Sequence, residues 1–340
     1  MDWKRTTRRV LIIVAILLVF GILSFQNGFF DTASAPFENV ADADPTGGEA
    51  DASSEVSFTI DLAYPAATIE DTRAFPANQD CVIVRMAPAD IFRGDLLLVN
   101  QDHRFELPDA QSFISIADEK SPSYRVVGED IMLEESAIEP LNSMMDGFFE
   151  ETGRDTVAII SAYRGYERQQ QILSEYIALM GNKEALRYAA PPGYSEHHAG
   201  LAVDLGYYSN GVLRTFPGTG ANMWFRQNCH NYGFILRFPG EKSAITKTAF
   251  EPWHFRYVGL PHSYIIQQNG WCLEEYIEFI MEHTRDEPFS AVFNDDAYEI
   301  YFTEDTEILL PYDCEFDISG NNINGFIVTI KLLSPVSQIR

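Results

Sequence analysis

Two short motifs contain the residues whose types and spacing could do chemistry. The first reads SEHHAGLAVD over residues 195–204 and places His197 seven residues before Asp204. The second reads EPWHFRY over residues 251–257 and contains His254. Zinc prefers a few nitrogen or oxygen ligands on separate rigid elements, with one position left for water if the site is catalytic. We therefore predict that His197, Asp204 and His254 hold one Zn²⁺ ion.

The second motif also offers a group that could move protons. Glu251 lies three residues before His254 and close to the apolar Trp253, whose surroundings should raise the pKa of the carboxyl. A carboxylate of this kind can take a proton from a metal-activated water and pass it to a leaving amine. We predict Glu251 as the general base, on an extended or bulged segment because Pro252 disfavours a helix.

A third motif, SAYRGYERQ over residues 161–169, lies at a predicted strand-to-helix junction. A fixed Arg164 there could hold a carboxylate through two hydrogen bonds or stabilise the oxyanion of a tetrahedral intermediate. The alternative is that Arg164 caps the following helix region or pairs with a surface acid.

Neighbouring residues offer competing interpretations of the first motif. Adjacent residues of an extended segment point to opposite faces, so only one of His197 and His198 can face the metal, and the spacing to Asp204 favours His197. Glu196 is expected to be a solvated acid or a partner of a ligand rather than a second base. In the second motif, Arg256 is expected to pack around the site, as are the aromatic residues beside it.

In chain order, the motifs SAYRGYERQ, SEHHAGLAVD and EPWHFRYVG resemble the signature of VanY-type D-alanyl-D-alanine carboxypeptidases. These bacterial zinc peptidases share a fold with the hedgehog signalling domain, and the resemblance covers roughly residues 90–283. It implies the same zinc ligands and the same base, and it makes Arg164 the residue that steadies the scissile carbonyl. It also implies substrate contacts by Gln169 and Ser195, to which we add Tyr163 beside the arginine.

The family resemblance implies removal of the terminal D-amino acid from peptidoglycan stem peptides. An endopeptidase of the same fold and a non-catalytic wall-binding or sensing module remain as alternatives. Whether the residue before the cleaved D-alanine is D or L is left open, and no protein partner is predicted.

An α+β core is predicted to position these motifs. A capping box at Ser136–Glu139 favours a helix that ends near Gly153, and two further helices are expected over 166–180 and 221–232. The expected strands are residues 95–100, 156–163, 201–205 and 234–238. After a helix over 273–283, strand-like runs at 298–302, 307–310 and 326–332, with a turn at Asn324-Gly325, predict a small β-rich C-terminal extension.

Six segments are predicted along the 340 residues. They are a cytoplasmic basic tail (1–9), a transmembrane anchor (10–30), an acidic flexible linker (31–55), a lead-in segment (56–89), the zinc carboxypeptidase domain (90–286) and the β-rich extension (287–340). The basic residues of the tail place the N-terminus inside, so the catalytic domain is expected outside the membrane.

Charge and cysteine content limit the possible partners. The formal net charge of −26 argues against a nucleic-acid partner, which would need clustered Lys and Arg. The four cysteines, Cys81, Cys229, Cys272 and Cys314, form no CxxC pair that would indicate a zinc ribbon. Some of them could form a disulfide in an exported protein, and buried thiols are an equal alternative.

Overall fold

The computed structural model describes residues 81–106, 113–128, 130–312 and 314–332. The chain divides into units 1–66 and 67–340, and every described residue belongs to the second unit. The predicted basic tail, anchor and acidic linker all lie outside the described residues. Among the residues that the structure does describe, no helix combines the length and the apolar composition needed to cross a membrane.

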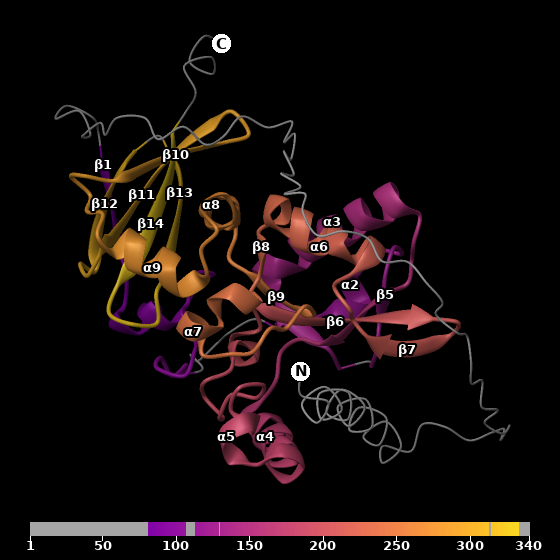
Figure 1. Cartoon of the computed structure of the whole chain (residues 1–340). Coiled ribbons are helices and arrows are strands. Elements are labelled where there is room, and N and C mark those ends of the chain that lie inside the picture. Colours follow the sequence, from indigo (N-terminus) through magenta and orange to yellow (C-terminus); the bar gives the residue numbers. More distant parts are fainter. Residues whose placement is uncertain (1–80, 107–112, 129, 313, 333–340) are drawn as a thin grey trace, which may run out of the picture. The chain divides into compact units, whose positions relative to one another are not determined.

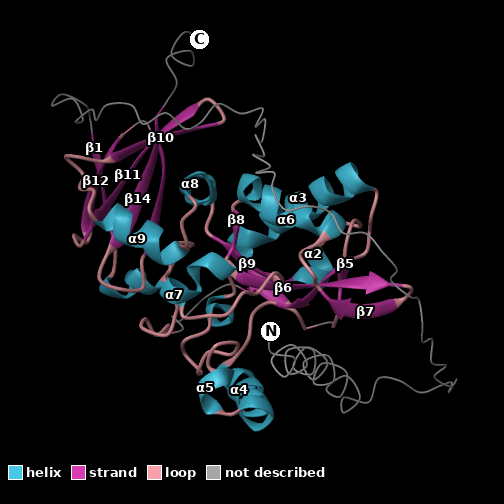
Figure 2. Cartoon of the chain, in the orientation of Figure 1, coloured by secondary structure: helices cyan, strands magenta, loops and turns pink. Residues whose placement is uncertain are grey.

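A six-stranded sheet forms the centre of the fold, and β6 (Ala202–Ser209) is its best-connected strand (Figure 2). Five strands follow the order β3-β5-β6-β9-β8, and β7 pairs with β6 off this path. The β3–β5 pair is parallel and the other pairs are antiparallel. The remaining bounds in this sheet are β3 (Arg125–Val126), β5 (Val157–Ser161), β7 (Val212–Thr215), β8 (Phe234–Leu236) and β9 (His254–Tyr257).

The central strands separate an apolar face from a polar one. Val203 and Leu205 on β6 and Phe255 on β9 belong to one buried apolar cluster. Successive side chains of a strand point to opposite faces of the sheet, so Asp204 and His254 must lie on the face away from that cluster. The apolar face is covered by helix α3 (Glu135–Thr152), which contributes Leu141, Met145 and Phe148 to the cluster.

The capping box predicted at the start of α3 is wrong, whereas the predicted end of this helix is confirmed. Glu134 is the N-cap and Ser136 is already helical, so the expected capping box does not form. The Ser136 hydroxyl instead donates a hydrogen bond to Asp95 Oδ1 at 2.8 Å. Gly153, with φ of 66°, ends the helix in the left-handed conformation that glycine adopts without a steric penalty.

Of the other two helices predicted before residue 233, one has the predicted bounds and one does not. Helix α4 (Tyr166–Met180) has the predicted bounds, and it lies beside α5 (Asn182–Ala185), with which it shares a small apolar cluster (Figure 1). The helix predicted over 221–232 is broken into α6 (Met223–Asn228) between two 3₁₀ turns, and Gly233 ends it as expected. Its asparagine, histidine and cysteine residues are weak helix formers.

Residues 96–99 are buried as predicted, but the segment 95–100 does not form the predicted strand. Leu97 and Val99 join the cluster under α3, whereas Leu96 and Leu98 join a second cluster. The backbone of this segment bonds to the end of β13 (Glu315–Gly320) and to the loop after it without joining a sheet: Leu96 N donates to the side-chain Oγ of Ser319 at 2.9 Å, and Leu98 N donates to Asn321 O at 3.1 Å.

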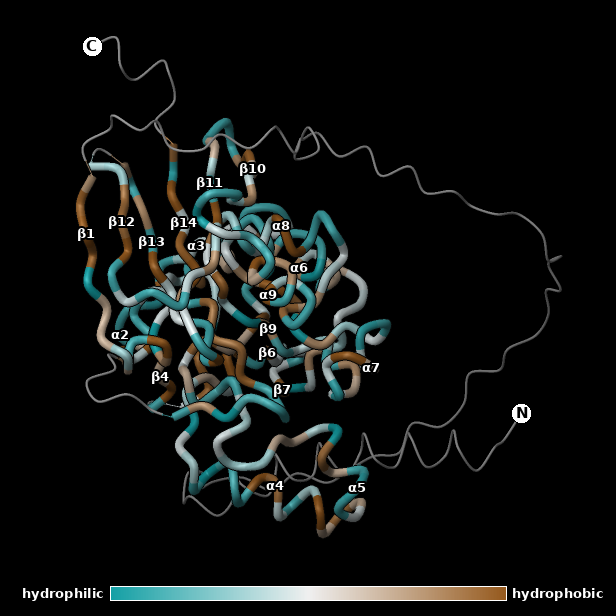
Figure 3. The backbone as a smooth tube through the Cα atoms, turned by 90° about the vertical axis from the view of Figure 1, so that its left-hand side faces the viewer, coloured by the Kyte–Doolittle hydropathy of each residue, from teal (hydrophilic) through white to brown (hydrophobic). Residues whose placement is uncertain are grey.

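A four-stranded antiparallel sheet with the order β10-β11-β14-β13 follows α9 (Leu273–Met281). Along β14 (Phe326–Leu332), Ile327 packs with α9, while Phe326, Val328 and Ile330 pack with the β1–β12 pair on the other face. The apolar stretch of β14 is visible in Figure 3. This sheet therefore has an apolar residue set on each face. The strands predicted at 298–302 and 326–332 form within it, and the strand predicted at 307–310 forms outside it, paired with β1.

The bounds of the other strands and helices complete the fold. They are β1 (Cys81–Arg85), β2 (Phe113–Ser115), α2 (Ile116–Glu119), β4 (Met132–Glu134), α7 (Ser243–Thr246), α8 (His262–Asn269), β10 (Phe289–Phe293), β11 (Asp296–Thr303), β12 (Glu307–Pro311) and β13 (Glu315–Gly320). Short 3₁₀ helices cover Pro88–Phe92, Glu196–Ala199 and Gly240–Lys242.

Candidate active site

The fold brings the three predicted ligands together on the polar face of the central sheet. His197 lies on the 3₁₀ helix Glu196–Ala199, Asp204 on β6, and His254 is the first residue of β9. Asp204 and His254 are directly paired across the two strands. All three are buried, and one potential ligand atom from each lies within 4.8 Å of the other two.

The nitrogen and oxygen atoms of the three side chains converge. Asp204 Oδ2 lies 3.2 Å from His197 Nε2, and Asp204 Oδ1 lies 3.0 Å from His254 Nδ1. His197 Nδ1 lies 2.6 Å from the carbonyl oxygen of Ala162, to which it donates, so Nε2 keeps a lone pair directed at the cluster. Two imidazoles and one carboxylate that converge in this way fit a zinc ion with an open coordination position.

The buried surroundings change the pKa of each of the three predicted ligands. Burial, together with Arg164, lowers the pKa of His197, which keeps its ring neutral and able to coordinate. Burial opposes a charge on His254, but hydrogen bonds to Asp204 and Glu196 raise its pKa to about 9. Against the cost of burial, the two histidines hold the pKa of Asp204 well below its usual range. Asp204 is therefore ionised and His197 neutral, as ligands must be, whereas His254 has to release a proton when a metal ion binds.

Glu251 lies beside the cluster, just before the turn that leads into β9. Its side chain is buried, and Oε2 is 3.9 Å from His254 Nδ1. Burial and the nearby Asp204 raise the pKa of Glu251 to about 8, although His254 and Arg164 act in the opposite direction. The raised pKa agrees with the expectation from the sequence, and a carboxyl group of this kind can exchange protons near neutral pH.

Arg164 reaches the same centre from the loop after β5. Its guanidinium donates to Gln169 Oε1 at 2.8 Å, to Ser161 Oγ at 2.7 Å and to Asp204 Oδ2 at 3.4 Å. Gln169 is fully buried in the first turn of α4, and its amide nitrogen donates to Ala190 O at 2.7 Å. Gln169 therefore fixes the direction of the arginine, a role that the motif alone did not indicate.

The remaining predicted substrate contacts, Ser195 and Tyr163, are close in the chain to His197 and Arg164. Ser195 is buried immediately before the 3₁₀ helix that carries His197, and its side chain forms no cap hydrogen bond with that helix. The ring of Tyr163 stacks on Phe113 with 4.0 Å between centroids. The structure thus places Tyr163 and Ser195 on the two loops that carry Arg164 and His197.

His198 faces away from the cluster. Its Nδ1 lies 2.6 Å from Arg164 O, its Nε2 accepts from Gly193 N at 2.9 Å, and its ring stacks on Tyr166. Both ring nitrogens have partners, so this histidine holds the Arg164 loop in place. The geometry agrees with the choice of His197 over His198.

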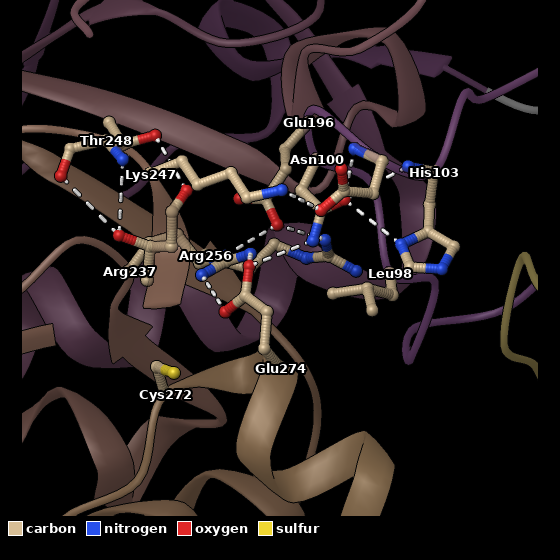
Figure 4. Close-up of polar contacts among 12 residues, drawn as sticks. Leu98, Asn100, His103, Glu196, Arg237, Lys247, Thr248, Arg256, Cys272 and Glu274 are labelled. Carbon is tan, nitrogen blue, oxygen red and sulfur yellow. Dashed lines mark hydrogen bonds and ion pairs between the residues drawn. The ribbon is translucent and has the colours of Figure 1, made fainter. Parts of the chain in front are cut away.

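A buried ionic network behind the ligands was missed from the sequence (Figure 4). Glu196 is only 3% exposed and contacts His254, so it is not a solvated acid but the partner of a ligand, the other role expected from the sequence. It contacts Arg237 and Arg256, both fully buried, as well as His254. The contact with His254 was one of the roles expected for Glu196, but the arginine contacts were not predictable because Arg237 belongs to no motif.

Known proteins match the part of the chain that contains these residues. The sequence model of the VanY family, described as D-alanyl-D-alanine carboxypeptidase, matches residues 130–260. A D-alanyl-D-alanine carboxypeptidase of Enterococcus faecium is 34% identical over 246 residues, which cover 71% of this chain and 76% of the relative. The bifunctional D-Ala-D-Ala dipeptidase and D-Ala-D-Ala carboxypeptidase VanXYC of Enterococcus gallinarum is 38% identical over 133 residues, or 38% of this chain and 70% of that protein.

A solved structure shows the same fold. The vancomycin resistance D,D-dipeptidase VanXYg, in complex with a D-Ala-D-Ala phosphinate analogue, matches with a TM-score of 0.66 and 31% sequence identity. The match covers 74% of this chain and all of the VanXYg chain. The α+β fold and the family resemblance predicted from the motifs are both confirmed. The chain is an enzyme, a member of the VanY family of D-alanyl-D-alanine carboxypeptidases.

Proposed function

We propose that this protein is a zinc-dependent carboxypeptidase that removes the C-terminal D-alanine from peptidoglycan stem peptides. The observation that carries the proposal is the convergence of one buried atom each from His197, Asp204 and His254 within 4.8 Å. Beside this cluster lie one buried carboxyl group, Glu251, and one guanidinium, Arg164. The site thus combines three potential metal ligands, a carboxyl group that can carry protons and a positively charged guanidinium.

In this proposal, zinc supplies Lewis-acid chemistry by polarising the scissile carbonyl and lowering the pKa of a water molecule. Glu251 takes up the proton of the attacking water and later delivers it to the amine of the departing D-alanine. Its raised pKa suits both steps because the carboxyl group must accept and release a proton at similar pH.

Arg164 binds and orients the peptide. Its side chain is largely buried and held by Gln169 and Ser161, so the guanidinium has a fixed direction before substrate arrives. A preorganised donor stabilises charge that develops on a carbonyl oxygen without having to reorganise during the reaction. The same guanidinium is suited to a substrate carboxylate, which is the end group that distinguishes a carboxypeptidase substrate.

The proposed location is the outer side of a bacterial membrane, with a single-pass anchor at residues 10–30. The support is the sequence pattern alone: Lys4, Arg5, Arg8 and Arg9 precede an apolar run, which favours an internal N-terminus. A peptidoglycan stem peptide would be accessible to the catalytic residues on that side. Protease treatment of intact cells would test this, because an external domain should be digested while a cytoplasmic one should be protected.

The function is tested by incubating the full-length protein with three peptides: a stem pentapeptide ending in D-Ala-D-Ala, a tetrapeptide ending in D-Ala, and an internally cross-linked muropeptide. We expect release of free D-alanine from at least one of the first two, loss of release with a chelator, and recovery with added zinc. Cleavage of only the cross-linked muropeptide would identify an endopeptidase. Absence of any zinc-dependent cleavage would contradict the proposal.

A further inference from the structure

The two histidines of the cluster present different ring nitrogens to its centre. His197 uses Nε2, since its Nδ1 donates to the Ala162 carbonyl. His254 has the opposite orientation: Nδ1 faces Asp204, whereas Nε2 points to Glu196 Oε2 at 3.4 Å. A neutral imidazole can coordinate a metal through one nitrogen only if the proton lies on the other. The tautomer of His254 therefore depends on what Nε2 contacts.

Glu196 is held in a single orientation by two arginines. Its Oε1 accepts from Arg237 Nε at 2.7 Å and from Arg256 Nη1 at 3.0 Å, which leaves Oε2 directed at His254. His254 and Arg256 are two residues apart on β9, so both side chains point to the same face and lie on either side of this carboxylate. Both arginines and the glutamate are buried almost completely.

The arginines are themselves anchored at their outer ends (Figure 4). Arg237 forms a two-point contact with Glu274, with Nη1 to Oε2 at 2.8 Å and Nη2 to Oε1 at 2.6 Å. Arg256 Nη2 donates to Asp95 O at 2.8 Å, and its Nε donates to Tyr257 O at 2.8 Å. The two glutamates and two arginines balance in charge. A buried network that is satisfied in this way holds its members rigidly.

We propose that Glu196 is a positioning residue for the reaction, which keeps the proton of His254 on Nε2 so that Nδ1 is free to coordinate the metal. Glu196 does not touch the reacting atoms and acts only through His254. This inference rests on the proposed metal-dependent function. Carboxylates that accept the outer N–H of a ligand histidine fix its tautomer and orientation.

Glu196→Gln gives a sharp test because the change is nearly isosteric. Arginines are only donors, so the glutamine must turn its oxygen toward Arg237 and Arg256. Its NH₂ group then faces His254 Nε2, which has to become an acceptor, and the proton moves to Nδ1. We expect zinc affinity, measured by competition with a chromophoric chelator, to fall by about 10- to 100-fold.

Glu275→Gln is the matched control. Glu275 follows Glu274 on α9, pairs with Lys242 and accepts from Cys272 N, and contacts no member of the network. The control should keep the zinc affinity of the unaltered protein. An unchanged zinc affinity in folded Glu196→Gln would overturn the inference and leave the proposed function standing, whereas absence of zinc binding by the unaltered protein would overturn both.

A measurement on the unaltered protein decides the question even if the variant does not fold. Long-range ¹H–¹⁵N NMR correlations of the zinc-loaded protein report which nitrogen of His254 carries the proton. The proposal requires a protonated Nε2 and a coordinated Nδ1. A proton on Nδ1 would contradict the proposal, and so would an Nε2 proton that lacks the downfield shift of a hydrogen bond to the Glu196 carboxylate.

Discussion

At the residue scale, the ligand cluster was predictable because its members lie in two compact motifs. The alternation of strand residues explains why the prediction works: Asp204 and His254 share the face opposite to Val203 and Phe255. The network around Glu196 was not predictable in the same way. Arg237 and Glu274 lie far from the motifs along the chain, and only the folded structure brings them to Glu196.

Arg164 carries a prediction at this scale. A lysine keeps the positive charge, but its ammonium group lacks the planar arrangement of N–H donors with which the Arg164 guanidinium contacts Gln169, Ser161 and Asp204. Arg164→Lys should lower kcat/KM for D-alanine release by about 10²- to 10³-fold, the usual effect of losing one such donor. Arg168→Lys, on the exposed side of α4, is the control and should leave kcat/KM unchanged. Equal kinetics for the two variants would show that Arg164 does not act on the substrate.

At the element scale, helices ended by glycine were predicted better than segments whose partners are distant. Gly153 and Gly181 end α3 and α4 as the sequence indicated. Residues 95–100 have the composition of a buried strand, yet their hydrogen-bond partners are at the end of β13 and in the loop after it, which no local pattern reveals. Gly94 shows how close this contact is, since a Cβ there would lie 2.8 Å from Ser319 Cα.

The contact between α8 and β14 carries a prediction about pH. His262 is buried, with Nδ1 2.5 Å from Tyr276 Oη and Nε2 3.1 Å from Thr329 Oγ1. Burial lowers its pKa from 6.5 to about 3. Between these values the unfolded chain binds a proton that the folded chain excludes. The contribution of His262 to stability is therefore complete above pH 6.5 and is lost as the pH falls toward 3.

Urea unfolding at several pH values measures this effect. In the unaltered protein, the free energy of unfolding should decrease on acidification, by up to about 1.4 kcal/mol per pH unit for one such group. In His262→Gln the decrease should be smaller, because the titrating group is absent. An identical pH dependence in the two proteins would show that His262 is not kept neutral by its burial.

At the scale of the whole molecule, the family membership and the α+β class follow from both the motifs and the comparisons. The predicted domain boundary at residue 287 stays a prediction. The second apolar cluster joins Leu98 and Ile235 with Ile300 and Ile327, so the C-terminal sheet shares a core with the residues around the site. Composition alone could not reveal this shared core, because each segment also has the composition of an independent unit.

The central claim is that one carboxyl group moves the protons while three other residues hold the metal. Glu251→Gln separates these two roles most directly, because the amide keeps the shape of the side chain but cannot carry a proton between water and amine. Zinc content and D-alanine release should be measured on the same preparation. We expect one bound zinc ion per chain and no detectable release of D-alanine. Release at the rate of the unaltered protein, from a zinc-loaded variant, would contradict it.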